Sequence, residues 1–155
     1  RSCGEEVEVC FVGDGTKRRE FEQLAKDLGI QDYVEFTGLL SSAAKVREKL
    51  LQSDLFVFPT KAEGLPRVII EAMAVGLPCI STPVNGIPEL LKHEFLLDPI
   101  DADAFADKIQ EMIHSPEKMN ECSIENIMKA QEYENSRLQQ RRNDFYSKLV
   151  LLVNR

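Results

Sequence analysis

The sequence predicts an α/β fold in which helices cover both faces of a doubly wound parallel sheet, followed by C-terminal helices. Three observations support this prediction. Short apolar runs alternate with amphipathic runs of about ten residues, which is the pattern of βαβ units. Glycine, proline and helix-capping residues stand at the boundaries between these runs. After residue 116 the strand signals stop and helical patterns continue.

The expected strands are short and mostly apolar, and they are Val7–Val12, Tyr33–Phe36, Leu55–Phe58, Cys79–Ser81 and Glu94–Leu97. Helices are expected at about Lys17–Leu28, Ala43–Gln52, Arg67–Val75, Pro88–Leu91 and Ala102–His114. Gly13 and Gly15 end the first strand, and Gly29 can cap the helix that follows. Pro66 stands where a helix can start, and Asp101 is a suitable N-cap.

The last part of the chain has a helical pattern. Pro116 separates two helices, and Arg137–Leu152 resembles one long helix that is rich in Arg and Gln on one side. Phe145, Leu149 and Leu152 recur along it at helical spacing. We expect this apolar stripe to pack on the domain itself or on a further domain.

Length and composition indicate one globular domain. The chain has 155 residues, of which 43% are hydrophobic and 29% are charged. We expect a single domain over residues 1–155, with an α/β sheet part at 1–115 and a helical extension at 116–155. The formal net charge of -7 disfavours nucleic acid as a partner, so any phosphate must be held by local amides and cations.

The cysteines and histidines give no sign of a metal site. No CxxC or Cys/His metal spacing occurs among the cysteines, which are Cys3, Cys10, Cys79 and Cys122. Cys10 and Cys79 lie in apolar runs, where a cysteine is usually just a small hydrophobe. His93 and His114 are expected at the surface. No apolar run approaches the roughly 20 residues of a membrane span and no signal pattern is present, so a reducing, cytoplasmic location is expected.

One stretch stands out for its charge pattern. Residues 62–78 read AEGLPRVIIEAMAVGLP, and from Val68 to Val75 only Glu71 is polar. A helix that is apolar on every side is normally buried on every side, and burying an isolated carboxylate is strongly unfavourable. Glu71 therefore needs a partner, either in the protein or in a ligand.

The predicted topology brings three unusual loops to one edge of the sheet. In open α/β sheets, ligands bind beyond the carboxyl ends of the strands. The loops at this edge are Gly13–Thr16, Thr37–Gly38 and Pro59–Leu65. The last of them leads into the helix that carries Glu71. The first turn of that helix has free amides that offer a phosphate site, those of Arg67, Val68 and Ile69.

Glu63 and Glu71 can border one cavity at this helix start. Two carboxylates beside a phosphate repel it unless they accept hydrogen bonds from hydroxyl groups, which the ribose and the sugar of a sugar nucleotide provide. A second interpretation is purely structural: Glu63 is an ordinary loop carboxylate, and Glu71 forms an i, i+4 ion pair with Arg67. Spacing alone leaves both interpretations open.

These motifs resemble one family of enzymes. The run AEGLPRVIIEAMAVGLPCISTPVNGIPELL is similar to the signature of the retaining, GT-B-fold glycosyl transferases group 1, or family 4. That signature has a Glu, seven residues and a second Glu, then Ala-Met-Ala, Gly-Leu-Pro and a Gly–Glu turn. Upstream, VEVCFVGDGTKRREFEQLAKDLGIQDYVEFTG looks like the strand–helix–strand that precedes it in the family. The resemblance covers about residues 6–114.

The resemblance implies a Rossmann-like, C-terminal domain that binds a UDP- or GDP-linked sugar, with the acceptor held mainly by an N-terminal domain of the same enzyme. It implies two catalytic residues. Glu71 would bind the ribose hydroxyls, and Glu63 would touch the donor sugar together with the amides of Gly64 and Leu65. The remaining donor-binding residues would hold the diphosphate or border the base, and they are Arg67, Val68, Ile69, Gly13, Gly15, Thr16, Thr37, Gly38 and Leu39.

The sequence departs from the family pattern in three places. The family's domain begins one strand–helix unit earlier, with a glycine-rich turn and a basic residue that grips the diphosphate, and this unit is absent from the sequence. Asn85 stands where the family usually has a second glycine, a mild change because Asn tolerates positive φ. Lys92–Pro99 is shorter than usual and lacks the glycines common before the last strand.

The function implied is transfer of a hexosyl group to a glycan or lipid-linked acceptor, as in polysaccharide biosynthesis, without a metal or other cofactor. The chain would be a fragment that is inactive by itself, and any peripheral membrane association would come through the missing domain. Two alternatives are a sugar-nucleotide epimerase of the same fold and a non-catalytic five-stranded module such as a phospho-receiver domain. The Glu-to-Glu spacing disfavours the first. The second would need an Asp at the end of a middle strand, and Asp54 instead begins one.

Overall fold

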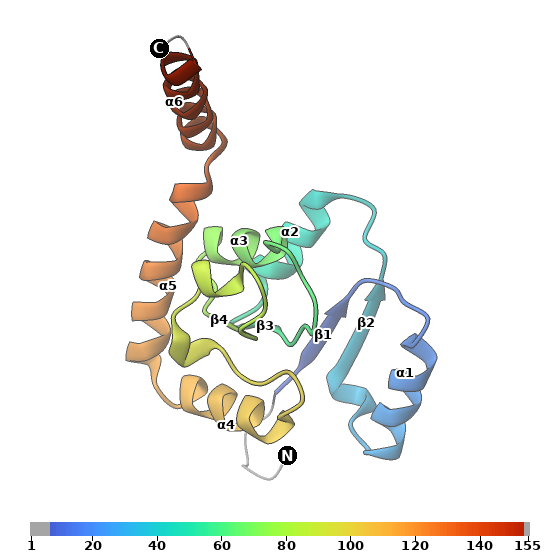
Figure 1. Cartoon of the computed structure of the whole chain (residues 1–155). Coiled ribbons are helices and arrows are strands. Elements are labelled where there is room, and N and C mark those ends of the chain that lie inside the picture. The colour runs from blue at the N-terminus through green and yellow to red at the C-terminus, as the bar shows by residue number, and fades with distance from the viewer. Residues whose placement is uncertain (1–6, 154–155) are drawn as a thin grey trace. The chain divides into compact units, whose positions relative to one another are not determined.

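The structure is a computed structural model that describes residues 7–153. Figure 1 follows its elements along the chain. The strands are β1 (Val9–Val12), β2 (Val34–Gly38), β3 (Phe56–Phe58) and β4 (Cys79–Ser81). The α-helices are α1 (Arg18–Asp27), α2 (Ala43–Leu51), α3 (Arg67–Ala74), α4 (Ala102–Ile113), α5 (Pro116–Ala130) and α6 (Asn135–Val153). Short 3₁₀ helices are η1 (Gln31–Tyr33), η2 (Ile87–Glu89), η3 (His93–Phe95) and η4 (Gln131–Tyr133).

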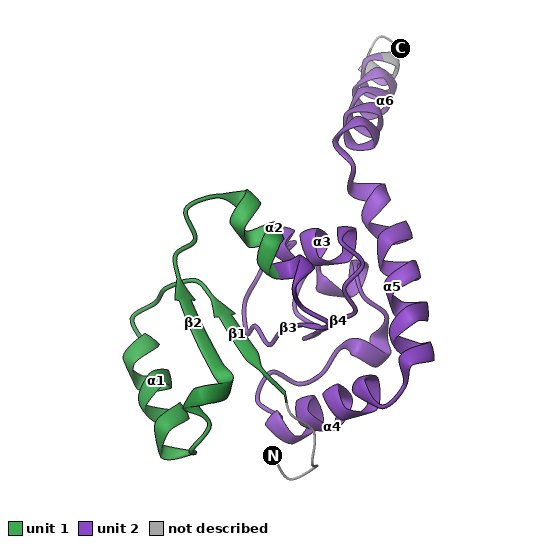
Figure 2. Ribbon diagram, turned by 180° about the vertical axis from the view of Figure 1, so that it is seen from behind, with its two compact units in different colours: residues 1–49 green, residues 50–155 purple. Residues whose placement is uncertain are grey.

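The predicted alternation of strands and helices is confirmed, and the strands are parallel. β1 pairs with β2, and β3 pairs with β4. The chain forms two compact units, which Figure 2 colours separately, with the boundary between Lys49 and Leu50 near the end of α2.

In unit 1, β1 and β2 lie side by side in register. Val9 is opposite Val34 and Phe11 is opposite Phe36, with the two phenyl rings stacked at 5.1 Å between centroids. Gly29 ends α1 as predicted: its φ is +67°, and the amide of the next residue, Ile30, donates to the Ala25 carbonyl at 2.9 Å. These local signals explain why the bounds of α1 agree with the prediction to within one residue at each end.

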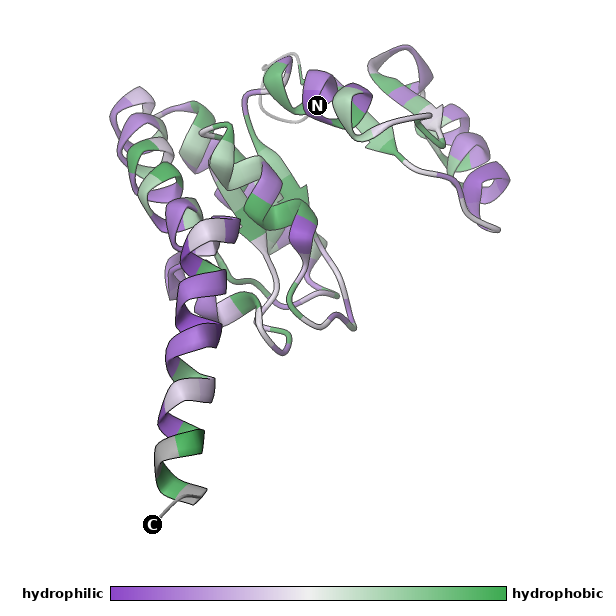
Figure 3. Cartoon of the chain, turned by 90° about the horizontal axis from the view of Figure 1, so that it is seen from above, coloured by the Kyte–Doolittle hydropathy of each residue, from purple (hydrophilic) through white to green (hydrophobic). Residues whose placement is uncertain are grey.

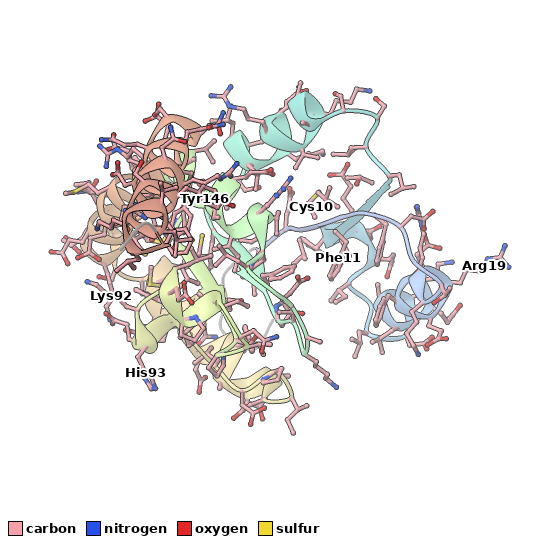
Figure 4. The ribbon with its side chains drawn as sticks, turned by 45° about the horizontal axis from the view of Figure 1, so that its top comes forward. Cys10, Phe11, Arg19, Lys92, His93 and Tyr146 are labelled. Carbon is pink, nitrogen blue, oxygen red and sulfur yellow. The ribbon has the colours of Figure 1, made fainter. Side chains whose placement is uncertain are left out.

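Strand β1 is much more exposed than its sequence predicts. All four of its residues are exposed, and Phe11 keeps 51% of its surface accessible. A continuous apolar run is typical of a strand covered on both faces, but in the described part of the chain β1 pairs with β2 alone. Cys10 is therefore exposed although it lies in an apolar run, and Figure 4 shows it on this strand beside Phe11. Cys3 lies outside the described residues.

In unit 2, β4 forms the centre of the core. Its three residues are buried, and its neighbour β3 is half-buried. Figure 3 shows hydrophobic residues gathered on the strands of this unit. The core around β4 is a cluster that draws on three further segments, η3, α4 and α5, and it consists of Ile80, Phe95, Phe105, Met112 and Cys122. Cys79 is buried, and burial raises the pKa of its thiol, which keeps it unreactive.

The predicted fifth strand, Glu94–Leu97, is wrong. Residues His93–Phe95 form η3 instead, and strand-like pairing is limited to one parallel bridge between Ser81 and Leu96. The Leu97 amide donates to the Ser81 carbonyl at 2.8 Å. A tight turn brings Phe95 into the core while its polar neighbours stay outside, and Figure 4 shows the side chain of His93 directed outward. The helix predicted at Pro88–Leu91 is likewise a single 3₁₀ turn, η2.

Helix α4 has a capped start, and an ion pair joins it to α5. The Asp101 carboxylate accepts the Ala104 amide at 2.9 Å, which confirms the predicted N-cap, and α5 begins at Pro116. The carboxylate of Glu111 pairs with Lys108 at 2.5 Å and with Lys118 of α5. Hydrogen bonds from these two ammonium groups lower the pKa of Glu111 to about 2, so the pairs persist at neutral pH.

Helix α6 confirms the long helix predicted at the C-terminal end. Each of its residues with a described side chain is exposed, including Phe145, Leu149 and Leu152 of the apolar stripe. Among the described elements, no helix is both long enough and apolar enough to cross a membrane. The stripe is therefore available to cover a surface outside this unit.

We expect the exposed stripe to make the chain self-associate. Replacing Phe145 and Leu149 by serine should keep the chain monomeric at concentrations where the unchanged chain forms dimers, because these side chains are 59% and 40% exposed. Sedimentation velocity measures this, with Asn143→Ser on another face of α6 as the control. A monomeric unchanged chain whose α6 amides are protected from hydrogen exchange would contradict it.

Candidate functional site

Helix α3 presents its first turn without an internal cap. Pro66 precedes it with extended backbone and offers no side-chain cap. The Ile69 amide donates to the Pro66 carbonyl at 3.2 Å. The amides of Arg67 and Val68 have no protein acceptor among the residues that the structure describes. Two of the three amides predicted to bind phosphate are therefore free, and the third is occupied by this local bond.

The helix has two contrasting faces. Ile69, Ala72 and Met73 are buried, while Arg67 and Glu71 are exposed. The expectation that an apolar helix is covered on every side is therefore wrong, because only this inner face packs against the unit, in part on α5. Gly76, with φ of +85°, ends the helix and lets the Leu77 amide reach the Ala72 carbonyl at 3.0 Å.

Glu71 has no protein partner in the part of the chain that the structure describes. The structural interpretation required an ion pair with Arg67, and among residues 7–153 the structure has no such pair and no hydrogen bond to the Glu71 carboxylate. Its side chain is exposed one turn into α3. The carboxylate is thus free to accept hydrogen bonds from a ligand.

The loop before α3 carries the other predicted carboxylate. Glu63 is half-buried, and Gly64 and Leu65 are exposed. The loop begins with a tight turn in which the Thr60 amide donates to the Phe58 carbonyl at 3.0 Å. Glu63, Gly64 and Leu65 thus lie in the loop of unit 2 that immediately precedes the free amides of α3.

The predicted residues of unit 1 form a second group at the ends of β1 and β2. The Gly13 amide donates to the Gly38 carbonyl at 3.0 Å, and the Thr37 hydroxyl lies 3.3 Å from the Phe11 carbonyl. Gly13, Thr37 and Gly38 are thus brought together. Two of the other predicted residues, Gly15 and Thr16, continue the loop after β1 in exposed positions, and the third, Leu39, is 80% exposed.

Sequence reasoning missed Arg18, which supports this second group. Its guanidinium donates to the Phe36 carbonyl at 3.1 Å and to Glu22 at 2.7 Å. Gly38 has φ of +68°, which L side chains rarely adopt, so this position favours glycine, and a Cβ there would also lie 2.9 Å from the Arg18 Nη1 and displace it. The i, i+4 spacing of Arg18 and Glu22 was the available signal for an ordered side chain.

The described residues hold no cluster of three or more His, Cys, Asp or Glu side chains with the arrangement of a metal site. What the candidate site offers in unit 2 is a set of backbone donors beside two carboxylates. Backbone amides suit a phosphate, and carboxylates suit hydroxyl groups.

Parallel strands linked by helices, with a loop–helix junction after β3, define the class of this protein as a Rossmann-like α/β protein. Comparison with family profiles then narrows the class. Residues 2–129 match the glycosyl transferases group 1 family, and the chain belongs to this family.

Individual relatives agree with the family match. The chain is 36% identical over 115 residues to the N-acetyl-alpha-D-glucosaminyl L-malate synthase of Bacillus anthracis, which covers 72% of this chain and 29% of the relative. Among solved structures, Anabaena HepE in complex with UDP-glucose is 25% identical, with a TM-score of 0.83 over 95% of this chain and 42% of HepE. The C-terminal domain of the group 1 protein LpcC from Francisella tularensis is 16% identical, with a TM-score of 0.71 over 83% of this chain and 85% of that domain.

These shares show which part of the family the chain represents. It spans less than a third of the length of the first curated relative, and it covers most of an isolated C-terminal domain. The fold is therefore that of the C-terminal domain of GT-B glycosyltransferases, as predicted.

Proposed function

We propose that this chain is the donor-binding part of a retaining glycosyltransferase that uses a nucleoside-diphosphate sugar. One observation carries the proposal: Glu71 is exposed, has no partner among the described residues, and lies one turn inside a helix whose first amides, at Arg67 and Val68, are free. A carboxylate and free amides in this order suit the alternating hydroxyl and phosphate groups of a sugar nucleotide.

The roles follow from the chemistry of each group. Glu71 accepts hydrogen bonds from the ribose hydroxyls, and the start of α3 holds the diphosphate. Glu63 and the amides of Gly64 and Leu65 contact the donor sugar. In unit 1 the base is bordered largely by backbone, from the loop Gly13–Thr16 and from Thr37–Leu39.

The reaction breaks the bond between the anomeric carbon and the diphosphate oxygen. The electron pair leaves with the diphosphate, where the amides and dipole of α3 stabilise the developing charge. The acceptor hydroxyl supplies the oxygen of the new glycosidic bond and loses its proton. The acceptor, a glycan or a lipid-linked hydroxyl receiving a hexosyl group, is held by an N-terminal domain of the longer enzyme, so the chain alone binds the donor without turning it over.

Titration with UDP, GDP and ADP, each with and without a chelator, tests the proposal. We expect one nucleotide to bind with a dissociation constant that the chelator leaves unchanged, because amides and the helix dipole replace a metal at the diphosphate. Binding that disappears on chelation would contradict the mechanism. Failure of all three nucleotides would contradict donor binding by this chain.

A further inference from the structure

We propose that the turn after β4, residues Thr82–Gly86, positions the donor loop Glu63–Leu65, and that Asn85 and Gly86 are its positioning residues. This inference rests on the proposed function and adds residues to it that contact the loop rather than the ligand. It explains how an exposed loop can hold two backbone amides in one orientation before a ligand arrives.

Four hydrogen bonds join the two segments, and all run in the same direction. The Ser81 hydroxyl donates to the Phe58 carbonyl at 2.7 Å, and the Thr82 hydroxyl donates to the Thr60 carbonyl at 2.7 Å. Further along, the side-chain amide of Asn85 donates to the Glu63 carbonyl, and the backbone amide of Gly86 donates to the Gly64 carbonyl at 3.0 Å. Every donor comes from the β4 side, and every acceptor is a main-chain carbonyl of β3 or its loop.

The direction of these bonds fixes the direction of the loop amides. In a trans peptide the C=O and the N–H point to opposite sides, and the described residues contain no cis peptide. The carbonyls of Glu63 and Gly64 point toward the Asn85–Gly86 turn. The amides of Gly64 and Leu65 belong to the same two peptides, so they point away from the turn, and among residues 7–153 they have no protein acceptor. These are the two amides assigned to the donor sugar.

Two of the four donors are anchored in the core, whereas the loop is not. Ser81 and Thr82 are fully buried, while Gly64 and Leu65 are exposed. The buried residues Ser81 and Thr82 therefore fix the start of the turn that contacts the exposed loop. A loop held in its binding conformation loses less conformational entropy when the ligand binds, and its donors need no reorganisation.

Asn85 and Gly86 are suited to this role for different reasons. Asn85 has φ of +46°, which asparagine tolerates better than most residues, and its side chain provides the N–H donor. A Cβ at Gly86 would lie 3.0 Å from the Gly64 carbonyl oxygen and 3.4 Å from the Leu65 Cα. A side chain at this position would therefore force the loop backbone to move away.

Three variants test the proposal with UDP and UDP-glucose as probes. Gly86→Ala pushes the loop away, and Asn85→Gly keeps the positive φ but removes the side-chain donor. The control is Gly76→Ala, which has the same crowding, 3.0 Å to the Ser123 Oγ, at the far end of α3. The loop amides contact the sugar and not the nucleotide. Gly86→Ala should therefore weaken the binding of UDP-glucose about tenfold and the binding of UDP less than twofold. Asn85→Gly should also weaken the binding of UDP-glucose more than that of UDP, but with a smaller loss of affinity. Gly76→Ala should lower Tm without changing the ratio of the two affinities.

Backbone NMR relaxation separates this inference from the proposed function, because it needs no ligand. In the unchanged chain the order parameters of Gly64 and Leu65 should lie near the rigid value of about 0.85, and in Gly86→Ala and Asn85→Gly they should fall toward about 0.6. Gly76→Ala should leave them unchanged. Order parameters that are the same in all four proteins, or equal losses of UDP and UDP-glucose affinity, would overturn the inference. Rigid loop amides in an unchanged chain that binds neither probe would instead reject the donor-binding function alone.

Discussion

Replacing Glu71 by glutamine is expected to weaken nucleotide binding by about 1–3 kcal/mol, the scale of a charge-assisted hydrogen bond to a ribose hydroxyl. The free energy of unfolding should stay the same or rise slightly, because the carboxylate is exposed and has no protein partner within residues 7–153. Glutamine keeps the shape of the side chain and removes its charge. A titration and a thermal melt on this one variant measure both quantities.

A matched control for this variant is Glu121→Gln, an exposed glutamate on α5 outside the candidate site. It should change neither affinity nor stability by more than about 0.5 kcal/mol. If Glu71→Gln instead unfolds more easily while its nucleotide affinity is intact, Glu71 has a structural role and the ribose assignment is wrong.

The opposite face of the same helix should show the opposite behaviour. Met73→Ala is expected to lower the free energy of unfolding by about 2–5 kcal/mol, because Met73 has no accessible surface and its truncation leaves a cavity under α3. This is a large share of the stability of a typical domain, so a fraction of the variant chain can be unfolded at 37 °C. Urea denaturation followed by circular dichroism measures the loss.

Met128→Ala on α5 is the control for that truncation, since 65% of Met128 is exposed and its removal leaves no cavity. Its effect should stay within about 0.5 kcal/mol. A decrease in the free energy of unfolding below about 1 kcal/mol for Met73→Ala would mean that the inner face of α3 is not tightly packed. Helix α3 would then not hold Glu71 in a fixed position.

Local signals in the sequence were enough to predict helices α1 and α4. The α1 and α4 helices begin and end within a residue of their predicted bounds, because Gly29 and Asp101 cap them through contacts with neighbouring residues. The prediction of a fifth strand was wrong because the conformation of that segment depends on contacts with distant residues. Whether Leu96 extends a strand depends on Ser81 and on the place of Phe95 in the core, and a short apolar run contains neither piece of information.

The sequence predicts which residues form the candidate site better than it predicts which residues hold them in place. The free amides of Arg67 and Val68 follow from a helix start at Pro66, which the sequence shows directly. The bonds that orient Glu63 and Gly64 come from Asn85 and Gly86, 22 residues later, and no periodicity connects such distant positions. Similarly, the apolar run of β1 predicts burial but cannot tell whether a covering strand is present.

The exposed edge of β1 has a consequence for colloidal behaviour. It presents four residues, VCFV, with no charge and no proline, and such an edge is a template on which a second copy can add a strand. At neutral pH the net charge of -7 holds copies apart, and this repulsion vanishes near the isoelectric point of about 4.9. Mild acid, as in many crystallisation and purification buffers, therefore removes the charge repulsion that keeps two β1 edges apart. This happens at a higher pH than the protonation of the Glu111 carboxylate.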